Sequence, residues 1–184
     1  MSALHEELLL ASRLLIERKP GQRGLLPTAR IRRSISTTYY ALFHFLLEEC
    51  GAKLIGTQHY LLKRRRLFVR EFSHQGIKNA LKHVQPQHPP DTIADYFRGN
   101  PVWAVKGNPR FARAVAGAFL RARDQRHQAD YDLNASLTAL DAVLLIDRVE
   151  ETIRLWDEAR TSAHRDFKNS LCLLMVLGGR IGRR

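Results

Sequence analysis

The sequence has few cysteines and no apolar run long enough to cross a membrane. Cys50 and Cys172 are its only cysteines, which excludes a disulfide framework and makes a reduced cytoplasm the simpler expectation. The apolar run "LCLLMVL" (171–177) is far shorter than the roughly 20 residues that a spanning helix needs. Charged residues such as Glu6 and Arg13 argue against a secretory signal near the N-terminus. We therefore expect a cytoplasmic protein with no membrane span.

Acidic residues and lysine are also scarce, whereas arginine is abundant. The 184 residues hold 30 Lys and Arg, of which 23 are Arg, against 18 Asp and Glu, for a formal charge of +12. Such a surplus favours an anionic partner such as nucleic acid or an acidic protein. A basic surface that is merely solvated is the other interpretation.

Strand-like alternation and internal repeats are absent, and helical periodicity dominates. The pattern predicts an all-α, up-and-down antiparallel helix bundle that forms one domain over residues 1–184. The expected helices are a first one ended by Pro20–Gly21, then 29–50 ended by Gly51, 58–72 capped by Thr57, 77–84, 110–131, one after 134, and 164–177. The helix over 29–50 has a wide apolar stripe, whose expected buried residues are Ile31, Ile35, Thr38, Leu42 and Phe45, with Tyr39 and Leu46 beside them. In the helix over 110–131 they are Phe111, Val115, Ala118 and Ala122. In the helix after residue 134, the expected buried residues are Leu137, Leu140, Leu144, Val149, Ile153 and Trp156.

Residues 85–109 differ from the rest because they hold five of the seven prolines. Two "GNP" triplets (99–101 and 107–109) predict turns on either side of "VWAVK". We expect an irregular insertion here, with a short helix at 92–97 and Trp103 as its anchor. The glycine- and arginine-rich residues 178–184 form a basic tail.

Charge is segregated along the chain. Residues 59–84 hold seven Lys and Arg against one acid, whereas residues 130–158 hold eight acids against two arginines. These two stretches could pair within one protomer or across a symmetric dimer.

Residues 121–132, "RARDQRHQADYD", gather arginines, a histidine, aspartates and a tyrosine within little more than three helical turns. Histidine can move protons near neutral pH, and arginine stabilises charge on phosphate oxygens. The cluster therefore predicts either a phosphate-binding or phosphate-cleaving site, or the polar contact of an ordinary helix bundle.

Several stretches together resemble a bacterial branch of the HEPN superfamily (higher eukaryotes and prokaryotes nucleotide-binding domain). "ARIRRSISTTYYALFHFLLEE" (29–49) is similar to the branch's A-R-x-x-R-A-x-S-x-x-Y-Y-A-x-F-H pattern. "RHQADYD" (126–132) is similar to its R-x-x-A-D-Y-D ending. "FVREFSHQGIK" (68–78) also resembles a stretch of that branch, and the resemblance covers most of the chain outside 85–109.

The resemblance implies a helix bundle that is commonly dimeric and needs no metal or cofactor. Many family members are metal-independent endoribonucleases, including toxins paired with small nucleotidyltransferases. Their R-x(4–6)-H signature brings an arginine and a histidine of two protomers together at the dimer interface. A homodimer, RNA or a nucleotide, and a nucleotidyltransferase-type antitoxin are therefore the expected partners.

The signature can be placed in two ways. Alignment to the branch pattern gives Arg126 and Tyr131, an R-x4-Y that replaces the family's histidine. Literal spacing gives Arg121 and His127, an R-x5-H one turn earlier. On the first placement the proton carrier is missing, because a tyrosine with its ordinary pKa of about 10 moves protons poorly at pH 7.

We therefore expect an RNA- or nucleotide-binding module in which Arg126, His127, Tyr131 and Arg121 line the site. A metal-independent endoribonuclease and a non-catalytic scaffold or regulatory partner remain open. In a purely structural role, Arg126 pairs with Asp130, the Tyr131 ring is buried, and Asp132 caps the next helix.

Further nucleic-acid contacts are expected from basic residues elsewhere in the chain. These are Arg32, Arg33, Lys63, Arg66 and Arg70. Tyr40 and His44 share a helix face that either meets a ligand beside Arg32 and Arg33 or is a packing contact. The histidines lack the spacing of metal ligands, so no metal is expected.

Overall fold

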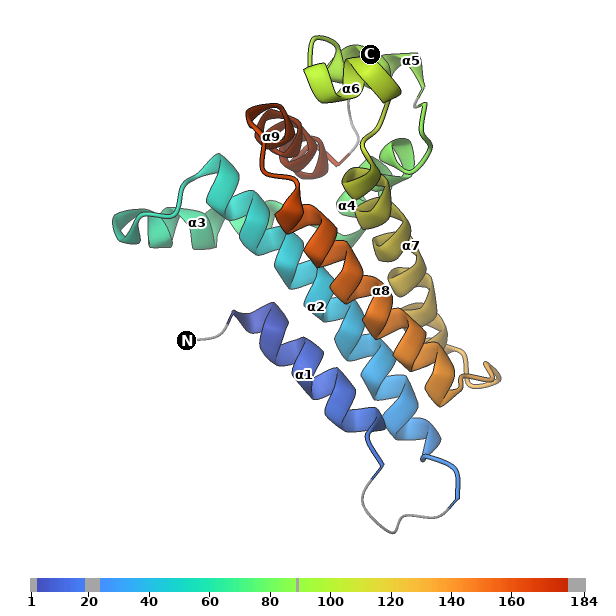
Figure 1. Cartoon of the computed structure of the whole chain (residues 1–184). Helices are drawn as coiled ribbons and strands as arrows, with labels where there is room; N and C mark the ends of the chain where they lie inside the picture. The colour runs from blue at the N-terminus through green and yellow to red at the C-terminus, as the bar shows by residue number, and fades with distance from the viewer. Residues whose placement is uncertain (1–2, 19–23, 89, 179–184) are drawn as a thin grey trace. The chain divides into compact units, whose positions relative to one another are not determined.

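The computed structural model describes residues 3–18, 24–88 and 90–178, and these residues form helices and connecting turns with no strand (Figure 1). The α-helices are α1 (Leu4–Ile16), α2 (Thr28–Leu54), α3 (Leu62–Phe68), α4 (His74–Val84), α5 (Asp91–Phe97), α6 (Pro101–Lys106), α7 (Arg110–Tyr131), α8 (Ala139–Glu158) and α9 (Ser162–Val176). The 3₁₀ turns η1 (His59–Leu61) and η2 (Val69–Glu71) flank α3. The all-α prediction is confirmed, and none of the described helices is long and apolar enough to cross a membrane.

The chain groups into two compact units. Unit 1 comprises Met1–Phe45 and Ala118–Glu151, and unit 2 comprises Leu46–Gly117 and Thr152–Arg184. Helices α2, α7 and α8 contribute residues to both units. One domain over residues 1–184 stays a prediction, and the predicted basic tail lies outside the described residues from position 179 onward.

In unit 1, the helices α1, α2, α7 and α8 run alongside one another (Figure 1). Helices α1 and α2 are antiparallel, because the Ser34 hydroxyl donates to the Ser12 carbonyl at 2.8 Å while the His5 ring lies 5.2 Å from that of Phe45. The wide apolar stripe of α2 is buried as its spacing predicted. Ile35, Tyr39 and Leu42 lie in the core, and the Tyr39 ring packs 5.6 Å from that of Phe119 on α7.

In unit 2, Trp156 of α8 occupies the core with no exposed surface. Its indole Nε1 donates to the Glu49 carboxylate at 2.6 Å, and its carbonyl accepts from the buried Lys168 ammonium at 2.6 Å. Burial lowers the pKa of Lys168. Because the Trp156 carbonyl is one of the last four of α8, Lys168 caps the C-terminal end of that helix.

Helix α2 does not end at Gly51 as predicted but continues to Leu54. A glycine inside a helix costs only about 1 kcal/mol relative to alanine, so it does not by itself end the helix. A Cβ atom at position 51 would lie 2.7 Å from Cγ of Arg65, so the missing side chain makes room for that residue. Gly51 therefore serves close packing.

The helix predicted over 58–72 is instead three short pieces, η1, α3 and η2. Thr57 is not its cap, because Gln58 directly precedes η1 and makes no side-chain cap bond. Phe72 is buried, whereas Leu61 and Phe68 are only half-buried. The chain does break before the next helix, but at Phe72 and Ser73 rather than over 73–76, because the Ser73 hydroxyl accepts from the Gly76 amide and α4 begins at His74.

The short helix predicted at 92–97 is confirmed as α5, but the rest of 85–109 is not irregular throughout, because it also contains α6. The stretch "VWAVK" lies inside α6, which begins with the Asn100 side chain accepting from two backbone amides and with Pro101 in the first turn. Gly107 ends α6 with φ of +71°, which favours glycine. Trp103 is half-buried rather than a buried anchor.

The predicted buried face of α8 is partly wrong. Leu140 and Leu144 are 63% and 57% exposed, and Val149 and Trp156 are buried as predicted. The residues that form the buried face are Ala142, Leu145, Ile146, Val149, Thr152 and Trp156. Leucine recurs on both sides of α8, so hydrophobicity alone did not select the side that packs.

Thr138 and Asp141 cap the start of α8 reciprocally. The Thr138 hydroxyl and amide both donate to Asp141 Oδ2, at 2.6 and 2.8 Å. These two bonds lower the pKa of Asp141 below its ordinary value of 3.8, and the bond from the Thr138 hydroxyl has the larger effect. A lowered pKa in the folded state stabilises the protein above pH 3.8, and this stabilisation disappears as the pH falls through the folded-state pKa.

We expect Thr138→Val to lower the free energy of unfolding by about 1 kcal/mol at pH 7. The difference between wild type and variant should begin to shrink below pH 3.8 and disappear once the pH has fallen through the lowered pKa of Asp141 in the folded wild type. Urea unfolding at pH 7 and pH 3 measures both values, with the exposed Ser136→Ala as a control. A difference that does not change with pH would contradict the role of Asp141.

Candidate functional site

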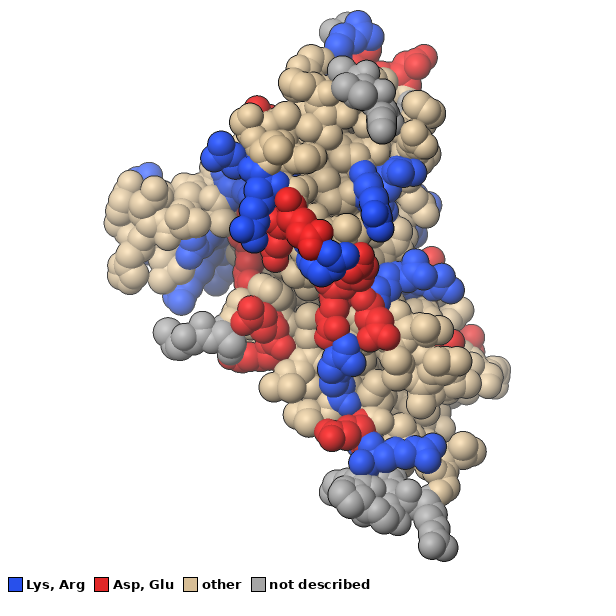
Figure 2. Space-filling model, viewed as in Figure 1, with Lys and Arg blue, Asp and Glu red and all other residues tan. Residues whose placement is uncertain are grey.

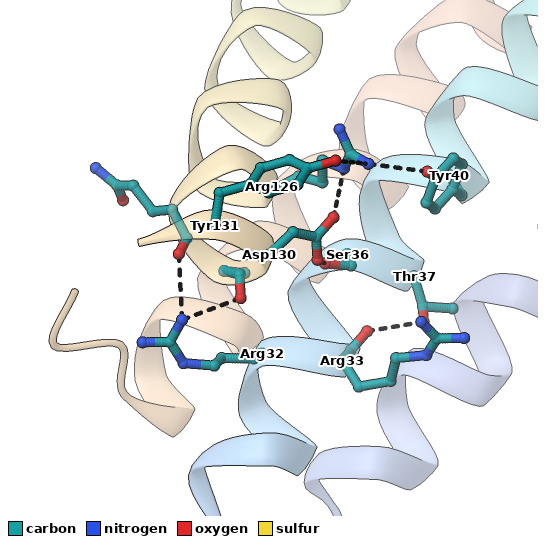
Figure 3. Close-up of polar contacts among 10 residues, drawn as sticks. Arg32, Arg33, Ser36, Thr37, Tyr40, Arg126, Asp130 and Tyr131 are labelled. Carbon is teal, nitrogen blue, oxygen red and sulfur yellow. Dashed lines mark hydrogen bonds and ion pairs between the residues drawn. The ribbon is translucent and has the colours of Figure 1, made fainter. Parts of the chain in front are cut away.

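Arg126, near the end of α7 in unit 1, lies at the centre of a polar cluster that α2 and α7 build together (Figure 3). Its Nε lies 2.6 Å from Oδ2 of Asp130, one turn further along α7. Its Nη2 donates to the hydroxyl of Tyr40 on α2 at 3.2 Å and to that of Tyr131 at 3.4 Å. Three oxygen groups from two helices therefore hold this guanidinium in one position.

Ser36 fixes the carboxylate that pairs with Arg126. The buried Ser36 hydroxyl donates to Oδ1 of Asp130, while Oδ2 faces Arg126 (Figure 3). The predicted pair of Arg126 and Asp130 is confirmed, and it forms one side of a larger network. Because both of its carboxylate oxygens have partners, the Asp130 side chain is held in one orientation, and it in turn holds Arg126.

The cluster keeps Arg126 charged and leaves part of it accessible. Burial lowers the pKa of Arg126, but the nearby Tyr40, Asp130 and Tyr131 raise it by more, so the net shift is upward. Its guanidinium carbon also lies 5.7 and 5.3 Å from the ring centres of Tyr40 and Tyr131. The side chain remains 25% exposed, so an anion can reach it from solvent.

Tyr131 is 63% exposed, so the interpretation in which its ring is buried is wrong. The ring of the exposed His127 lies 5.2 Å from the Tyr131 ring, tilted by 51°. Although His127 follows Arg126 directly, its i, i+4 spacing to Tyr131 brings it beside the cluster. Arg121 is also exposed, and it lies close enough to Asp141 to help lower that residue's pKa.

Arg32 serves a different purpose from the predicted nucleic-acid contact. Its two terminal nitrogens donate to five backbone carbonyls, those of Gln128, Ala129, Asp132, Leu133 and Ala135. Two of these belong to the last turn of α7, where carbonyls lack helical partners, and the others belong to the following turn. Arg32 therefore caps α7 and holds the turn that carries Tyr131 (Figure 3).

The remaining predicted nucleic-acid residues make none of the hydrogen bonds or ion pairs of this network. Arg33 is exposed on α2, and its carbonyl accepts from the Thr37 hydroxyl at 2.8 Å. Lys63, Arg66 and Arg70 are exposed but belong to unit 2, on α3 and η2. The Asp132 side chain accepts from the Asn134 amide, so it stabilises the turn rather than the start of α8.

Two acids of α8 in unit 1, Asp147 and Glu150, pair with α1. Nη2 of Arg13 lies 3.1 Å from Asp147 and 2.5 Å from Glu150, and these carboxylates raise the pKa of Arg13. Figure 2 shows basic and acidic side chains alternating on this face. The basic stretch 59–84 falls within unit 2, so its predicted pairing with 130–158 stays a prediction.

Sequence reasoning offered Tyr40 and Arg32 as residues near a ligand, but it missed Ser36 and the way in which α2 orients Arg126. Arg32, Ser36 and Tyr40 are spaced by four residues, which places them on one helical stripe beside the buried one. All three contact the last turns of α7 or the turn after it. A polar stripe of i, i+4 spacing beside an apolar stripe was the available signal.

No described group of three or more His, Cys, Asp or Glu residues is arranged to hold a metal ion. The donor groups around Arg126 are phenols, one carboxylate and one hydroxyl, and the carboxylate is already paired with the guanidinium. The cluster therefore suits an anion rather than a cation.

Comparisons of the chain with protein-family models, with curated proteins and with solved structures gave no match.

Proposed function

We propose that the chain is a HEPN-like, cytoplasmic RNA- or nucleotide-binding module that uses Arg126 as its phosphate contact. The observation that carries the proposal is the Arg126 guanidinium, held by Asp130, Tyr40 and Tyr131 while 25% of its side chain stays exposed. A positioned guanidinium binds a phosphate with two parallel hydrogen bonds and loses little side-chain entropy. The exposed Tyr131 ring beside it offers a surface on which a base can stack.

Asp130 limits the attraction of the site for phosphate, because its carboxylate offsets the charge of Arg126 at 2.6 Å. Arg123 adds little further positive charge, because its Nη1 pairs with Oδ1 of Asp124 at 3.3 Å. Arg123 and Arg126 are one turn apart on α7. The proposed ligand is therefore bound mainly by the charge of Arg126 and by stacking on Tyr131.

Binding without cleavage is the preferred function because the residue at the family's histidine position is Tyr131. The test is titration of fluorescein-labelled single-stranded RNA in EDTA at several salt concentrations. We expect salt-dependent binding with the RNA intact, because phosphate contacts release counterions. Absence of binding at low salt would refute the proposal.

One observation favours a metal-independent endoribonuclease as the second candidate. The His127 ring lies 5.2 Å from the Tyr131 ring, so a histidine does adjoin the cluster despite the R-x4-Y register. Cleavage of total RNA in EDTA that disappears in His127→Ala but persists in His44→Ala would establish this function. Intact RNA in the presence of bound protein would exclude it under those conditions.

We also propose that unit 1 forms a homodimer through exposed leucines of α1 and α8. Leu10 and Leu14 of α1 are 61% and 54% exposed, and Leu140 and Leu144 of α8 are exposed to a similar extent. Of the thirteen residues of α1, only Ser12 is buried. Helices α1 and α8 are neighbours, because Arg13 pairs with Asp147 and Glu150, and exposed leucines on adjacent helices favour a protein contact. The nucleotidyltransferase-type antitoxin implied by the family resemblance stays an expectation.

Leu144→Glu should raise the dimer dissociation constant about tenfold or more, because burying a leucine contributes about 1.5–3 kcal/mol. Sedimentation over a range of concentrations measures this constant. Leu25→Glu, an identical change at a leucine outside both helices, should leave it unchanged. Equal dimer dissociation constants for Leu144→Glu and Leu25→Glu would show that the dimer contact does not involve Leu144.

A further inference from the structure

A second basic surface lies in unit 2, on the segment His59–Glu71, which comprises η1, α3 and η2 and which we name the α3 arm. It carries five of the basic residues of the chain, Lys63, Arg64, Arg65, Arg66 and Arg70, and a single acid, Glu71. In Figure 1 the arm branches from the end of α2. Its residues divide into an inner and an outer side.

The inner side packs against the end of α2 and the turn after it. Nη1 of Arg65 donates to the Gly56 carbonyl at 3.0 Å. The Cγ atom of Arg65 lies so close to Gly51 that a Cβ atom on residue 51 would be only 2.7 Å from it. Cγ1 of Val69 would lie 3.2 Å from the same Cβ atom. Arg65 is therefore used for packing and is not available to a ligand.

The outer side holds the remaining cations. Lys63, Arg64, Arg66 and Arg70 are all exposed, and the ion pairs of the described residues involve none of them. At roughly 100° per residue in α3, and about 120° per residue in the 3₁₀ turn η2 that holds Arg70, these positions fall on one half of the arm, opposite Arg65. Four positive charges therefore face solvent together.

An aromatic ring lies among these charges. Tyr60, at the start of the arm, is 78% exposed, and Leu67, one turn after Lys63, is 54% exposed. The helical spacing places Tyr60 and Leu67 on the same half as the four cations. The Tyr60 ring is therefore not part of the packed core, and its exposed face can contact a flat partner such as a base.

Cations beside an exposed aromatic ring are the features that bind single-stranded nucleic acid, where phosphates meet the cations and an unpaired base stacks on the ring. A membrane surface would need a broad apolar face opposite the basic one. Here the face opposite the cations packs against α2, and only Tyr60 and Leu67 are apolar and well exposed. A single strand is therefore the partner that fits.

We infer that the α3 arm is a binding surface for single-stranded nucleic acid, with Lys63, Arg64, Arg66 and Arg70 as phosphate contacts and Tyr60 as the stacking residue. This surface goes beyond the proposed function because it requires neither Arg126 nor any other residue of unit 1. It makes the ligand a strand of several nucleotides rather than a mononucleotide.

The test is titration of the full-length protein with a fluorescein-labelled oligo(U) at several salt concentrations. The arm variant replaces Lys63, Arg64, Arg66 and Arg70 by alanine. The control variant replaces four other exposed cations of unit 2, Lys82, Arg110, Arg160 and Arg165, and so removes the same charge with the same residue types. Circular dichroism establishes that each variant is folded.

The arm variant should bind the strand at least tenfold more weakly than the control variant does. The log of its affinity should fall less steeply with the log of the salt concentration, by about 0.7 in slope for each phosphate that the arm no longer binds. Tyr60→Ala should weaken binding by roughly 5- to 100-fold without changing that slope, whereas Tyr60→Phe keeps the wild-type affinity. None of these changes should affect binding of a mononucleotide, which reports on Arg126 separately.

Equal weakening in the arm and control variants would overturn the inference, because it would show an effect of net charge alone. Unchanged affinity in Tyr60→Ala would overturn the stacking role. Vesicles of phosphatidylcholine with phosphatidylserine supply the remaining comparison. Binding to those vesicles, without binding to oligo(U), would show that the arm recognises a lipid surface and would refute the single-strand assignment.

Discussion

Replacing Arg126 with alanine is expected to weaken mononucleotide binding by about 100-fold. The guanidinium is the proposed phosphate contact, and a hydrogen bond to a charged group contributes about 1.5–3 kcal/mol. The change also removes the partner of Asp130, whose carboxylate would then repel the phosphate. Isothermal titration of wild type and variant with uridine 5′-monophosphate measures the effect.

Two further variants separate the role of Arg126 from general charge. Arg126→Lys keeps the charge but loses the planar fork and its contacts with two phenols, so we expect intermediate affinity. Arg121→Ala removes one exposed charge from the same helix and should change affinity less than about threefold. If Arg121→Ala weakened binding as much as Arg126→Ala, the R-x5-H placement of Arg121 and His127 would be correct instead.

Arg32→Ala is expected to lower the free energy of unfolding by about 2–3 kcal/mol, which is a large effect for a residue at the surface of unit 1. The reason is that one side chain donates to five carbonyls at the end of α7 and in the turn after it. Water can replace only part of these bonds, because Ala129 is buried. Urea unfolding at neutral pH measures the loss.

Arg33→Ala is the matched control, since Arg33 is exposed on the same helix and should change stability by less than about 0.5 kcal/mol. Arg32→Lys should recover only part of the lost stability, because an ammonium group cannot span carbonyls on both sides of the turn. Similar stabilities for Arg32→Ala and Arg33→Ala would show that the hydrogen bonds to the carbonyls contribute nothing measurable.

The helices with a single wide apolar stripe were predicted well from the sequence. Ile35 and Leu42 of α2 and Val115 of α7 are buried as their spacing indicated. The stripe of α8 was harder, because Leu140 and Leu144 extend it onto the exposed side. Periodicity identifies a helix, but an amphipathic helix with leucine on two faces does not reveal which face meets the core.

Two errors came from reading glycine and proline as breaks alone. Gly51 lies inside α2 because Arg65 and Val69 fill the space that a side chain would occupy. The turn predicted at the first GNP triplet is present at Arg98 and Gly99, but Asn100 and Pro101 also start α6, a signal that was present in the sequence and was not used. Glycine and proline mark both the inside and the ends of helices, so their neighbours must be considered with them.

The candidate site was predicted in part. The sequence singled out Arg126, Tyr131 and His127, and the structure brings these three side chains together. Ser36 and Tyr40 could not be assigned to Arg126 in advance, because that depends on how α2 and α7 are rotated against each other. The use of Arg32 as a cap was equally hidden, since a basic residue on a helix is normally solvated.

The central claim is that Arg126 binds phosphate, and NMR titration of arginine side-chain resonances tests it most directly. Arg126→Lys identifies the Nε–Hε resonance of Arg126, and uridine 5′-monophosphate is then added in EDTA. The account predicts that the Arg126 resonance and the Tyr131 ring resonances shift together and saturate at one affinity. Saturating shifts confined to other arginines, with Arg126 and Tyr131 unchanged, would contradict it.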